Sequence, residues 1–383
     1  MRVGVLVEQA LAPVPGGTGR YSVELAAALA RTAADDDTVS GWTSWHRDME
    51  LARVGGVDGP RRLPLGRRAL AASWERGLGP APRGVDVLHA PTPLFPPRRQ
   101  PLVVTVHDTV PWTHPETLTA RGARWHRHMA ERAARVADAI AVPTQAVRDE
   151  LHELLPATRG RIHVLGAGVS AALRRAPEPA VGARVAARLR LPETYVLSLA
   201  TLEPRKGLDL LIEAIALLGP SAPPLVVVGQ PGWGGVDLRR AAASAGVDPE
   251  LVHALGKVSD GELAVLLRGA RLLVAPSRAE GFGLPVAEAM AVGTPVVCSD
   301  APALVEVAGD AASIVARGDP VALAAAIGEL LADAAKRERL ATAGLARAAR
   351  FDWDVVAHRA WTLYYTLLEG SPGRLPRSSS SSA

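Results

Sequence analysis

Residues 276–300 read PSRAEGFGLPVAEAMAVGTPVVCSD, and this stretch is the most informative part of the chain. Its pattern indicates the end of a strand, a glycine loop, a short helix and the next strand. Glu280 lies in the loop and Glu288 on the helix, with Gly281 and Gly283 at the bend. A helix that begins at glycines presents free backbone N–H groups and the positive end of its dipole, which suits a phosphate. Ionised carboxylates accept hydrogen bonds from sugar hydroxyls, so the segment predicts a nucleotide sugar or a similar ligand.

Length and composition set the scale of the protein. A chain of 383 residues exceeds the size at which one hydrophobic core keeps growing, so two domains are expected. No apolar run reaches the roughly 18 residues of a membrane-spanning helix, and no signal peptide is recognisable. The single cysteine, Cys298, lies in an apolar strand and is expected to be a core residue. These features predict a cytoplasmic protein.

The formal net charge is +4, and the excess of basic residues falls in the first half of the chain. Such a half would attract an anionic acceptor or an anionic membrane surface, and the latter implies peripheral membrane association. A solvated, arginine-rich surface explains the same excess, and we favour that interpretation. Nucleic-acid binding would need a concentrated basic face, which this modest excess does not supply.

Apolar strands alternate with amphipathic helices through both halves, which predicts parallel, doubly wound sheets. In the first half, strands are expected at 2–7, 85–89, 102–107, 139–142 and 161–165, and helices at 20–31 and 121–136. In the second half, strands are expected at 195–200, 224–229, 251–255, 271–275 and 295–298, and helices at 207–218, 259–268 and 284–291.

A stretch rich in glycine and proline, residues 166–192, interrupts the alternation and is the expected linker. We therefore predict an N-terminal Rossmann-like domain over residues 1–175 and a C-terminal one over residues 190–352. Helices between residues 319 and 368 close the folded part. The serine-rich residues 371–383 are predicted to form a disordered tail. Ligands of such sheets bind beyond the carboxyl ends of the strands.

Arg205 and Lys206 follow a predicted strand in the sequence LEPRKG, residues 202–207. They fall at the carboxyl end of the second sheet, on the same rim as Glu280. Two adjacent cations at this place can neutralise a diphosphate leaving group as its bond to a sugar breaks. An isolated Arg-Lys pair is usually a solvated basic turn. Its expected position beside the glutamate loop favours the functional interpretation.

Two further strand ends carry candidate residues. Gly16 and Gly17 belong to a GGTG sequence between the first strand and the first helix. Its spacing departs from the dinucleotide-binding GxGxxG pattern, so it is either a helix start or a place where backbone amides approach a phosphate across an interdomain cleft. His107 and Asp108 follow another strand. His107 is a candidate for contacting the transferred sugar or the acceptor, although a lone histidine is more often structural.

Together these motifs resemble those of glycosyltransferase family 4, a group of retaining enzymes with the GT-B fold, and in particular its mannosyltransferase-like branch. The matching segments are GGTGRY at 16–21, HD at 107–108, EPRKG at 203–207 and EGFGLPVAEAM at 280–290. The last is the family's E-x7-E motif and is highly specific. The resemblance extends to about Leu368. It implies two Rossmann-like α/β domains that face an interdomain cleft, with a C-terminal helix at 353–369 that packs back on the first domain.

The resemblance also assigns roles to residues of this chain. A nucleotide-diphosphate sugar would be the co-substrate, with no other cofactor. Arg205 and Lys206 would hold its diphosphate, Glu280 would accept hydrogen bonds from the sugar, and Glu288 would accept them from both ribose hydroxyls. His107 would lie near the sugar and complete the catalytic set. The remaining donor contacts would come from Gly16, Gly17, Val258, Gly281, Phe282, Gly283 and Leu284.

One position departs from part of the family. Some inositol mannosyltransferases carry an arginine six positions before the lysine, where this chain has Ala200, so Arg205 must supply the guanidinium and the match to lipid-inositol enzymes is weaker. The family's retention of configuration is explained by front-face substitution, in which the departing phosphate helps to remove the acceptor's proton. The segment 35–37, DDD, superficially resembles a metal-binding motif but follows a helix, so a solvated loop is expected. No other cluster has metal-ligand spacing, which predicts a metal-independent enzyme.

The combination of motifs is typical of enzymes that use GDP-mannose to build cell-envelope polysaccharides or glycolipids. We therefore expect a hexosyltransferase that acts on a glycan or a lipid-linked glycan, at the inner face of the membrane. Asp108 and Trp112 are the acceptor-side candidates, because aromatic faces suit sugar rings. A UDP-sugar or another nucleotide-sugar donor stays open, as does a sugar-nucleotide epimerase of the same fold. A dinucleotide oxidoreductase is disfavoured by the glycine spacing.

Overall fold

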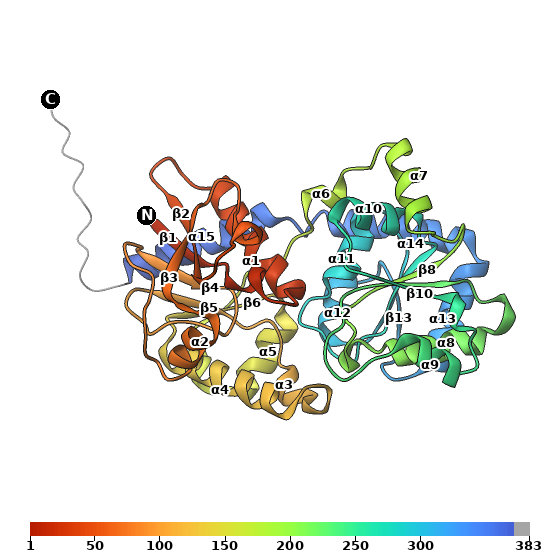
Figure 1. Ribbon diagram of the computed structural model, residues 1–383, viewed down its shortest axis with the longest axis horizontal. Helices are drawn as coiled ribbons and strands as arrows, with labels where there is room; N and C mark the ends of the chain where they lie inside the picture. Colours follow the sequence, from red (N-terminus) through yellow and green to blue (C-terminus); the bar gives the residue numbers. More distant parts are fainter. Residues whose placement is uncertain (371–383) are drawn as a thin grey trace. The chain divides into compact units, whose positions relative to one another are not determined.

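The computed structural model describes residues 1–370 and contains two parallel β-sheets, each with helices on both faces (Figure 1). The predicted disordered tail at 371–383 lies outside the described residues. Contacts divide the chain into two compact units. Within the described residues, the first unit comprises residues 1–105, 132–141 and 354–370, and the second comprises residues 106–131 and 142–353.

The first sheet has seven strands in the order β3-β2-β1-β4-β5-β6-β7. Its strands are β1 (Arg2–Leu6), β2 (Thr38–Trp45), β3 (Asp58–Gly66), β4 (Val87–Ala90), β5 (Leu102–Thr105), β6 (Ala139–Val142) and β7 (Ile162–Val164). The sequence pattern missed β2 and β3. Residues 38–45 read TVSGWTSW and carry small polar residues in a buried strand, while residues 58–66 carry prolines and arginines, which an edge strand tolerates.

The second sheet has six strands in the order β10-β9-β8-β11-β12-β13. They are β8 (Val196–Leu199), β9 (Leu225–Val228), β10 (Val252–Gly256), β11 (Leu272–Ala275), β12 (Val296–Ser299) and β13 (Ser313–Val315). The short edge strand β13 is the one that the sequence pattern did not predict.

Most helices connect consecutive strands of one sheet, as the alternation predicted, while α6 and α7 lie between the two sheets in the chain and α13 to α15 follow the last strand. Those before the second sheet are α1 (Gly16–Arg31), α2 (Arg67–Glu75), α3 (Val110–Thr113), α4 (Ala120–Val136), α5 (Gln145–Leu154), α6 (Ala171–Arg174) and α7 (Pro179–Arg188). Those that follow β8 are α8 (Leu208–Leu218), α9 (Leu238–Ser244), α10 (Asp260–Gly269), α11 (Leu284–Ala291), α12 (Pro302–Ala308), α13 (Pro320–Ala332), α14 (Ala334–Ala348) and α15 (Trp353–Glu369). None of the helices within residues 1–370 is long and apolar enough to cross a membrane.

The predicted linker at 166–192 contains two helices that the sequence pattern did not predict. It contains α6 and α7, and both helices contact α10. Pro179 occupies the first position of α7, where proline is tolerated because that N–H has no intrahelical partner. Pro177 and Pro179 therefore stand before and at the start of a helix, and Pro192 follows its end.

Both faces of the second sheet are buried. On β12, the side chains of Val296 and Cys298 pack in one hydrophobic cluster and that of Val297 packs in the other. Because helices cover both faces, the central strands are mostly apolar and show no regular alternation with polar residues. Cys298 is a buried core residue, as expected, and burial raises the pKa of its thiol to about 12.

Helix α15 packs within the first unit through buried aromatic residues. Trp361 donates a hydrogen bond from Nε1 to Thr32 Oγ1 at 3.1 Å. The ring of Tyr364 is fully buried, and its hydroxyl lies 2.5 Å from Nδ1 of His89, whose Nε2 lies 2.8 Å from Thr105 Oγ1. A polar chain inside the core thus links the last helix to β4 and β5.

We predict that Tyr364→Phe destabilises the protein, because the change leaves a buried nitrogen of His89 without its partner. The expected cost is about 1–3 kcal/mol in the free energy of unfolding, measured by urea denaturation. Tyr365→Phe is the matched control, since Tyr365 is 41% exposed on the same helix and does not contact His89. Equal destabilisation by the two changes would contradict the role assigned to the buried chain.

Candidate active site

The glutamate loop connects β11 to α11 at the carboxyl edge of the second sheet. Gly283 is the N-cap of α11 with φ of 95°, a left-handed conformation that favours glycine. A side chain there would also collide with Leu304, since a Cβ would lie 2.3 Å from its Cδ2. No side chain caps the helix, so its first-turn N–H groups are not taken by an N-cap side chain. The end of α11 is therefore suited to an anion.

The basic turn follows β8, the strand that pairs with β11. Residues Pro204–Lys206 form a single 3-10 turn, and Gly207 then starts α8 with φ of 66°. A Cβ on Gly207 would lie 2.3 Å from the carbonyl oxygen of Pro276, so this glycine allows the turn to touch the start of the glutamate loop. Parallel pairing of neighbouring strands thus brings two distant sequence motifs to one edge.

Glu280 is the point at which the two motifs meet. Lys206 Nζ lies 2.6 Å from its Oε1 and Arg205 Nη1 lies 3.0 Å from its Oε2. Ser277 Oγ donates a further hydrogen bond to Oε1 at 2.8 Å. The spatial convergence of the Arg-Lys turn with the glutamate loop, on which the predicted site depends, is thus a feature of the structure.

A second carboxylate, Glu203, holds Arg205 from the other side. Arg205 donates from Nη2 to Glu203 Oε1 at 2.7 Å and from Nε to the same atom at 3.2 Å. Arg205 also donates from Nη1 to the carbonyl oxygen of Ala279 at 3.0 Å. Glu203 is only 2% exposed. The sequence analysis did not single out this residue, although its position two residues before Arg205 in the same turn was the available signal.

The carboxylates of the cluster differ in their electrostatics. Burial alone would raise the pKa of Glu280, but Lys206 and Arg205, with the hydrogen bonds, outweigh it and lower that pKa to about 2. For Glu203, burial dominates over the attraction of Arg205 and Lys206, and the pKa is raised. Burial opposes the charge of Arg205, but Glu280, Glu203 and Asp108 outweigh it and raise its pKa. Glu280 is therefore ionised and can act only as a hydrogen-bond acceptor at neutral pH.

The segment with His107 and Asp108 lies against the glutamate loop in the second unit. A Cβ added to Gly281 would lie 1.7 Å from the carbonyl oxygen of His107 and 3.2 Å from Cβ of Asp108. The carbonyl oxygen of Gly281 accepts a hydrogen bond from Thr144 Oγ1 at 2.9 Å. Gly281 is thus required by close backbone packing. The carboxylate of Asp108 is near enough to contribute to the raised pKa of Arg205.

The other predicted residues occupy different surroundings. Glu288 lies on α11 and is 4% exposed. Phe282 packs edge-on against Phe351 with ring centroids 5.5 Å apart. Trp112 in α3 and Val258 after β10 are half-buried. Gly16 and Gly17 lie in the first unit, where they form the first turn of α1 rather than the loop before it.

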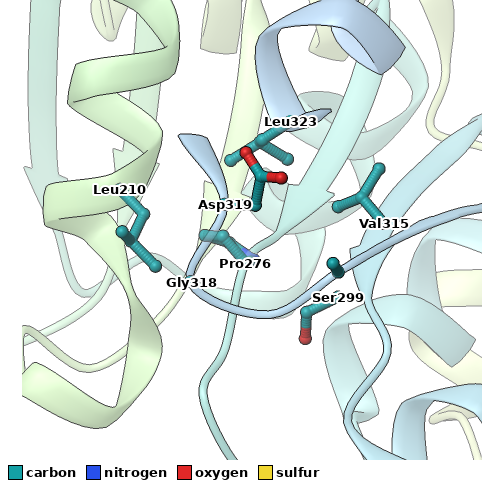
Figure 2. Close-up of a pocket in the computed structure, with 8 residues that line it drawn as sticks. Leu210, Pro276, Ser299, Val315, Gly318, Asp319 and Leu323 are labelled. Atoms are coloured by element: carbon teal, nitrogen blue, oxygen red, sulfur yellow. The ribbon is translucent and has the colours of Figure 1, made fainter. Parts of the chain in front are cut away.

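Two cavities adjoin these motifs. The one in Figure 2 has a volume of about 10 Å³, and Pro276 and Ser299 from two strand ends contribute to its lining. It holds at most one water molecule and is too small for a sugar or a nucleotide. A larger cavity of about 250 Å³ lies on the other side of the basic turn, between Glu203, Leu208 and Asp237.

Within the described residues, no group of three or more histidine, cysteine, aspartate or glutamate side chains is arranged to hold a metal ion. The DDD segment at 35–37 has a different role in the structure. The amino group of Met1 lies 2.8 Å from Asp37 Oδ1, and Asp37 also accepts a hydrogen bond from Tyr365. These contacts tie the chain's first residue to α15.

Comparison with known proteins identifies the class. Residues 15–173 match the model described as glycosyltransferase family 4, and residues 184–347 match the model described as glycosyl transferases group 1. The chain is 32% identical to O-antigen chain mannosyltransferase B of Escherichia coli over 272 residues, 70% of this chain and 71% of that protein. It is also 32% identical to the MMP alpha-(1->4)-mannosyltransferase of Mycolicibacterium hassiacum, over 69% of this chain and 65% of that protein.

Solved structures give the same fold. Sucrose-phosphate synthase from Thermosynechococcus elongatus superimposes with a TM-score of 0.76 at 22% identity, over 97% of this chain and 100% of that one. The Anabaena protein HepE in complex with UDP and glucose superimposes with a TM-score of 0.74 at 20% identity, over 96% and 100%. The chain belongs to glycosyltransferase family 4, has the GT-B fold and is a glycosyltransferase of the mannosyltransferase-like branch.

We predict that Gly281→Ala lowers stability, because the backbone of His107 cannot yield as a flexible side chain can. Overpacking of this kind costs about 1–3 kcal/mol or more, measurable as a lower midpoint of thermal unfolding. The control is Gly261→Ala in α10, where nothing lies within 4 Å of an added Cβ and the better helix propensity of alanine is expected to stabilise by up to about 1 kcal/mol. A Gly281→Ala variant that melts with the wild type would refute the proposed close packing.

Proposed function

We propose that the protein is a retaining glycosyltransferase that transfers mannose from GDP-mannose to a glycan or a lipid-linked glycan in the synthesis of cell-envelope polysaccharide. The observation that carries the proposal is the cluster of Arg205, Lys206 and Glu280 at the carboxyl edge of the second sheet, next to the uncapped start of α11. The two mannosyltransferases similar to this chain support the choice of sugar.

The cluster supplies the two kinds of contact that a nucleotide-diphosphate sugar needs. Arg205 and Lys206 bind the diphosphate, and the first-turn N–H groups of α11 add to the positive field. Glu280 accepts hydrogen bonds from the sugar hydroxyls because its low pKa keeps it ionised. Glu288, four residues into α11, accepts hydrogen bonds from the ribose. Glu203 acts through Arg205, whose guanidinium it orients.

The chemical step depends on charge stabilisation. As the bond between the sugar and the diphosphate breaks, negative charge grows on the leaving oxygen, and fixed cations lower the energy of that state. Glu280 carries no proton at neutral pH and therefore cannot be the acid for the leaving group. In the proposed front-face substitution, the acceptor's proton passes to the departing phosphate. Donor binding and leaving-group stabilisation thus use the same residues.

A UDP-sugar donor is the second candidate, and the similarity of fold to a protein solved with UDP and glucose is the observation that favours it. The proposed phosphate and sugar contacts do not involve the base, so they serve either nucleotide. A sugar-nucleotide epimerase would use the same phosphate cluster without an acceptor. Release of free nucleotide diphosphate that depends on an acceptor separates the transferase from the epimerase. We propose that the reaction takes place in the cytoplasm, at the inner face of the membrane, where a lipid-linked acceptor would be held.

The test is a donor screen with GDP-, UDP-, ADP- and dTDP-sugars, in the presence and absence of membrane extract, with release of nucleotide diphosphate as the readout. Glu280→Gln is expected to lower kcat/KM by about 10²–10³-fold, because a preorganised acceptor is replaced by a mixed donor and acceptor. Glu213→Gln is the matched control, since Glu213 is exposed on α8 and is not part of the cluster. If Glu280→Gln turns over the donor at the wild-type rate, Glu280 does not have the proposed role of accepting hydrogen bonds from the sugar.

We also predict that activity survives removal of divalent cations. Arg205, Lys206 and the start of α11 supply the charge that the leaving diphosphate requires, so EDTA is expected to leave the rate of donor turnover unchanged. The measurement compares initial rates before and after chelation. Complete loss of activity on chelation, with recovery on addition of manganese, would overturn this prediction.

A further inference from the structure

A second cluster of polar side chains lies in the first unit, at the carboxyl edge of its sheet. Glu8 follows β1, His46 follows β2 and Arg67 follows β3, which are three neighbouring parallel strands. The strand order reverses between β1 and β4, so Glu8 stands at the topological switch point. Ligands of doubly wound sheets bind in the crevice at that point. None of the motifs used for the donor includes these three residues.

Glu8 is the buried centre of this cluster. Ser44 donates to Glu8 from its backbone nitrogen at 2.7 Å and from its hydroxyl at 3.1 Å. The Nε2 atom of His46 lies 3.0 Å from Glu8 Oε1 and 3.2 Å from Oε2. The Glu8 side chain is 8% exposed and that of His46 is 21% exposed. A buried carboxylate with these partners fixes the imidazole at the rim.

Arg67 lies near the same carboxylate but does not form a hydrogen bond with it. Its Nε lies 3.9 Å from Glu8 Oε1, too far for a hydrogen bond, and its side chain is 34% exposed. Within residues 1–370, its buried Nη1 atom has no hydrogen-bond partner. A guanidinium that served only as an internal ion pair would satisfy its donors on Glu8. The Arg67 side chain is 34% exposed, so although Nη1 itself is buried, the exposed part of the guanidinium can meet a group from outside the chain.

The surroundings of Arg67 also favour an anion. Arg67 and Arg68 stand in the first turn of α2, where the helix dipole disfavours cations, and no acidic residue lies in that turn. The N-cap residue Gly66 offers no side-chain hydrogen bond. An anion bound by Arg67 would offset the unfavourable interaction of the arginines with the dipole.

We propose that Arg67 and His46, held by Glu8, bind an anionic group on the sugar acceptor, a phosphate monoester or a carboxylate. This proposal rests on the proposed glycosyltransferase function and specifies the acceptor's chemistry. Arg67 supplies paired N–H donors to the anion, which suits phosphate and carboxylate geometry. His46 contacts a neighbouring oxygen, and Glu8 is a positioning residue. Acceptors without a negative charge would leave the donors of Arg67 unpaired and would bind more weakly.

The experiment uses the full chain with its donor site saturated with GDP, so that added anions cannot occupy the diphosphate position. Calorimetry then measures the binding of mannose 6-phosphate, glucuronate, inorganic phosphate and uncharged mannose. The wild type is expected to bind mannose 6-phosphate or glucuronate at least tenfold more tightly than mannose. Arg67→Gln is expected to lose this difference. Arg68→Gln, the same charge change at an exposed neighbouring position, is expected to keep it.

The outcomes separate this proposal from the function on which it rests. If the wild type neither binds GDP nor turns over a donor, the proposed function is wrong. If the anionic subsite is separate from the donor site, Arg67→Gln binds GDP as tightly as the wild type does. Equal binding of charged and uncharged sugars by the wild type would overturn the anionic subsite. An equal loss of this preference in the Arg67 and Arg68 variants would also overturn it, because the effect would then come from general surface charge. Phosphate that binds as tightly as mannose 6-phosphate, with no contribution from the sugar, would also contradict an acceptor subsite.

Discussion

The proposed donor site depends on one largely buried carboxylate with two cationic partners. Glu280 contacts Lys206 and Arg205 at once, and each cation lies in a turn after a strand paired with the strand that leads to Glu280. Removing either cation leaves a buried charge partly uncompensated, which costs far more than loss of a surface ion pair. The cluster therefore stabilises the rim of the sheet, and the same charges suit the diphosphate that a glycosyltransferase must hold.

Glycines permit this arrangement by removing side chains where backbones meet. Gly207 accommodates the carbonyl of Pro276, and Gly281 accommodates that of His107. Gly283 adopts the left-handed conformation that begins α11 without a side-chain cap. The glycine-rich character of the glutamate loop therefore has two effects. It brings three chain segments into contact, and it lets α11 begin without a side-chain cap. Function and close packing cannot be separated at these positions.

The two units share one feature of their sheets. In both sheets, polar side chains gather after the carboxyl ends of parallel strands, where the backbone ladder ends and the connecting loops begin. In the second unit the gathered groups are Glu280, Arg205 and Lys206, and in the first they are Glu8, His46 and Arg67. The proposed reaction assigns the donor to one set and a charged acceptor to the other. The fold thus provides two similar sheet edges, and the side chains at each edge determine which ligand it can bind.

The sequence by itself determined the alternation of strands and helices, the apolar strands of the second sheet and the specific E-x7-E motif. These features follow from local periodicity and from residue types at fixed spacing. Only the tertiary structure decided that 166–192 contains two helices, that residues 38–45 form a buried strand, and that Glu203 and Glu280 share Arg205. It also decided the meeting of Glu8, His46 and Arg67. The reason is physical: such contacts depend on strand order and register, which are set by non-local packing and not by any short window of sequence.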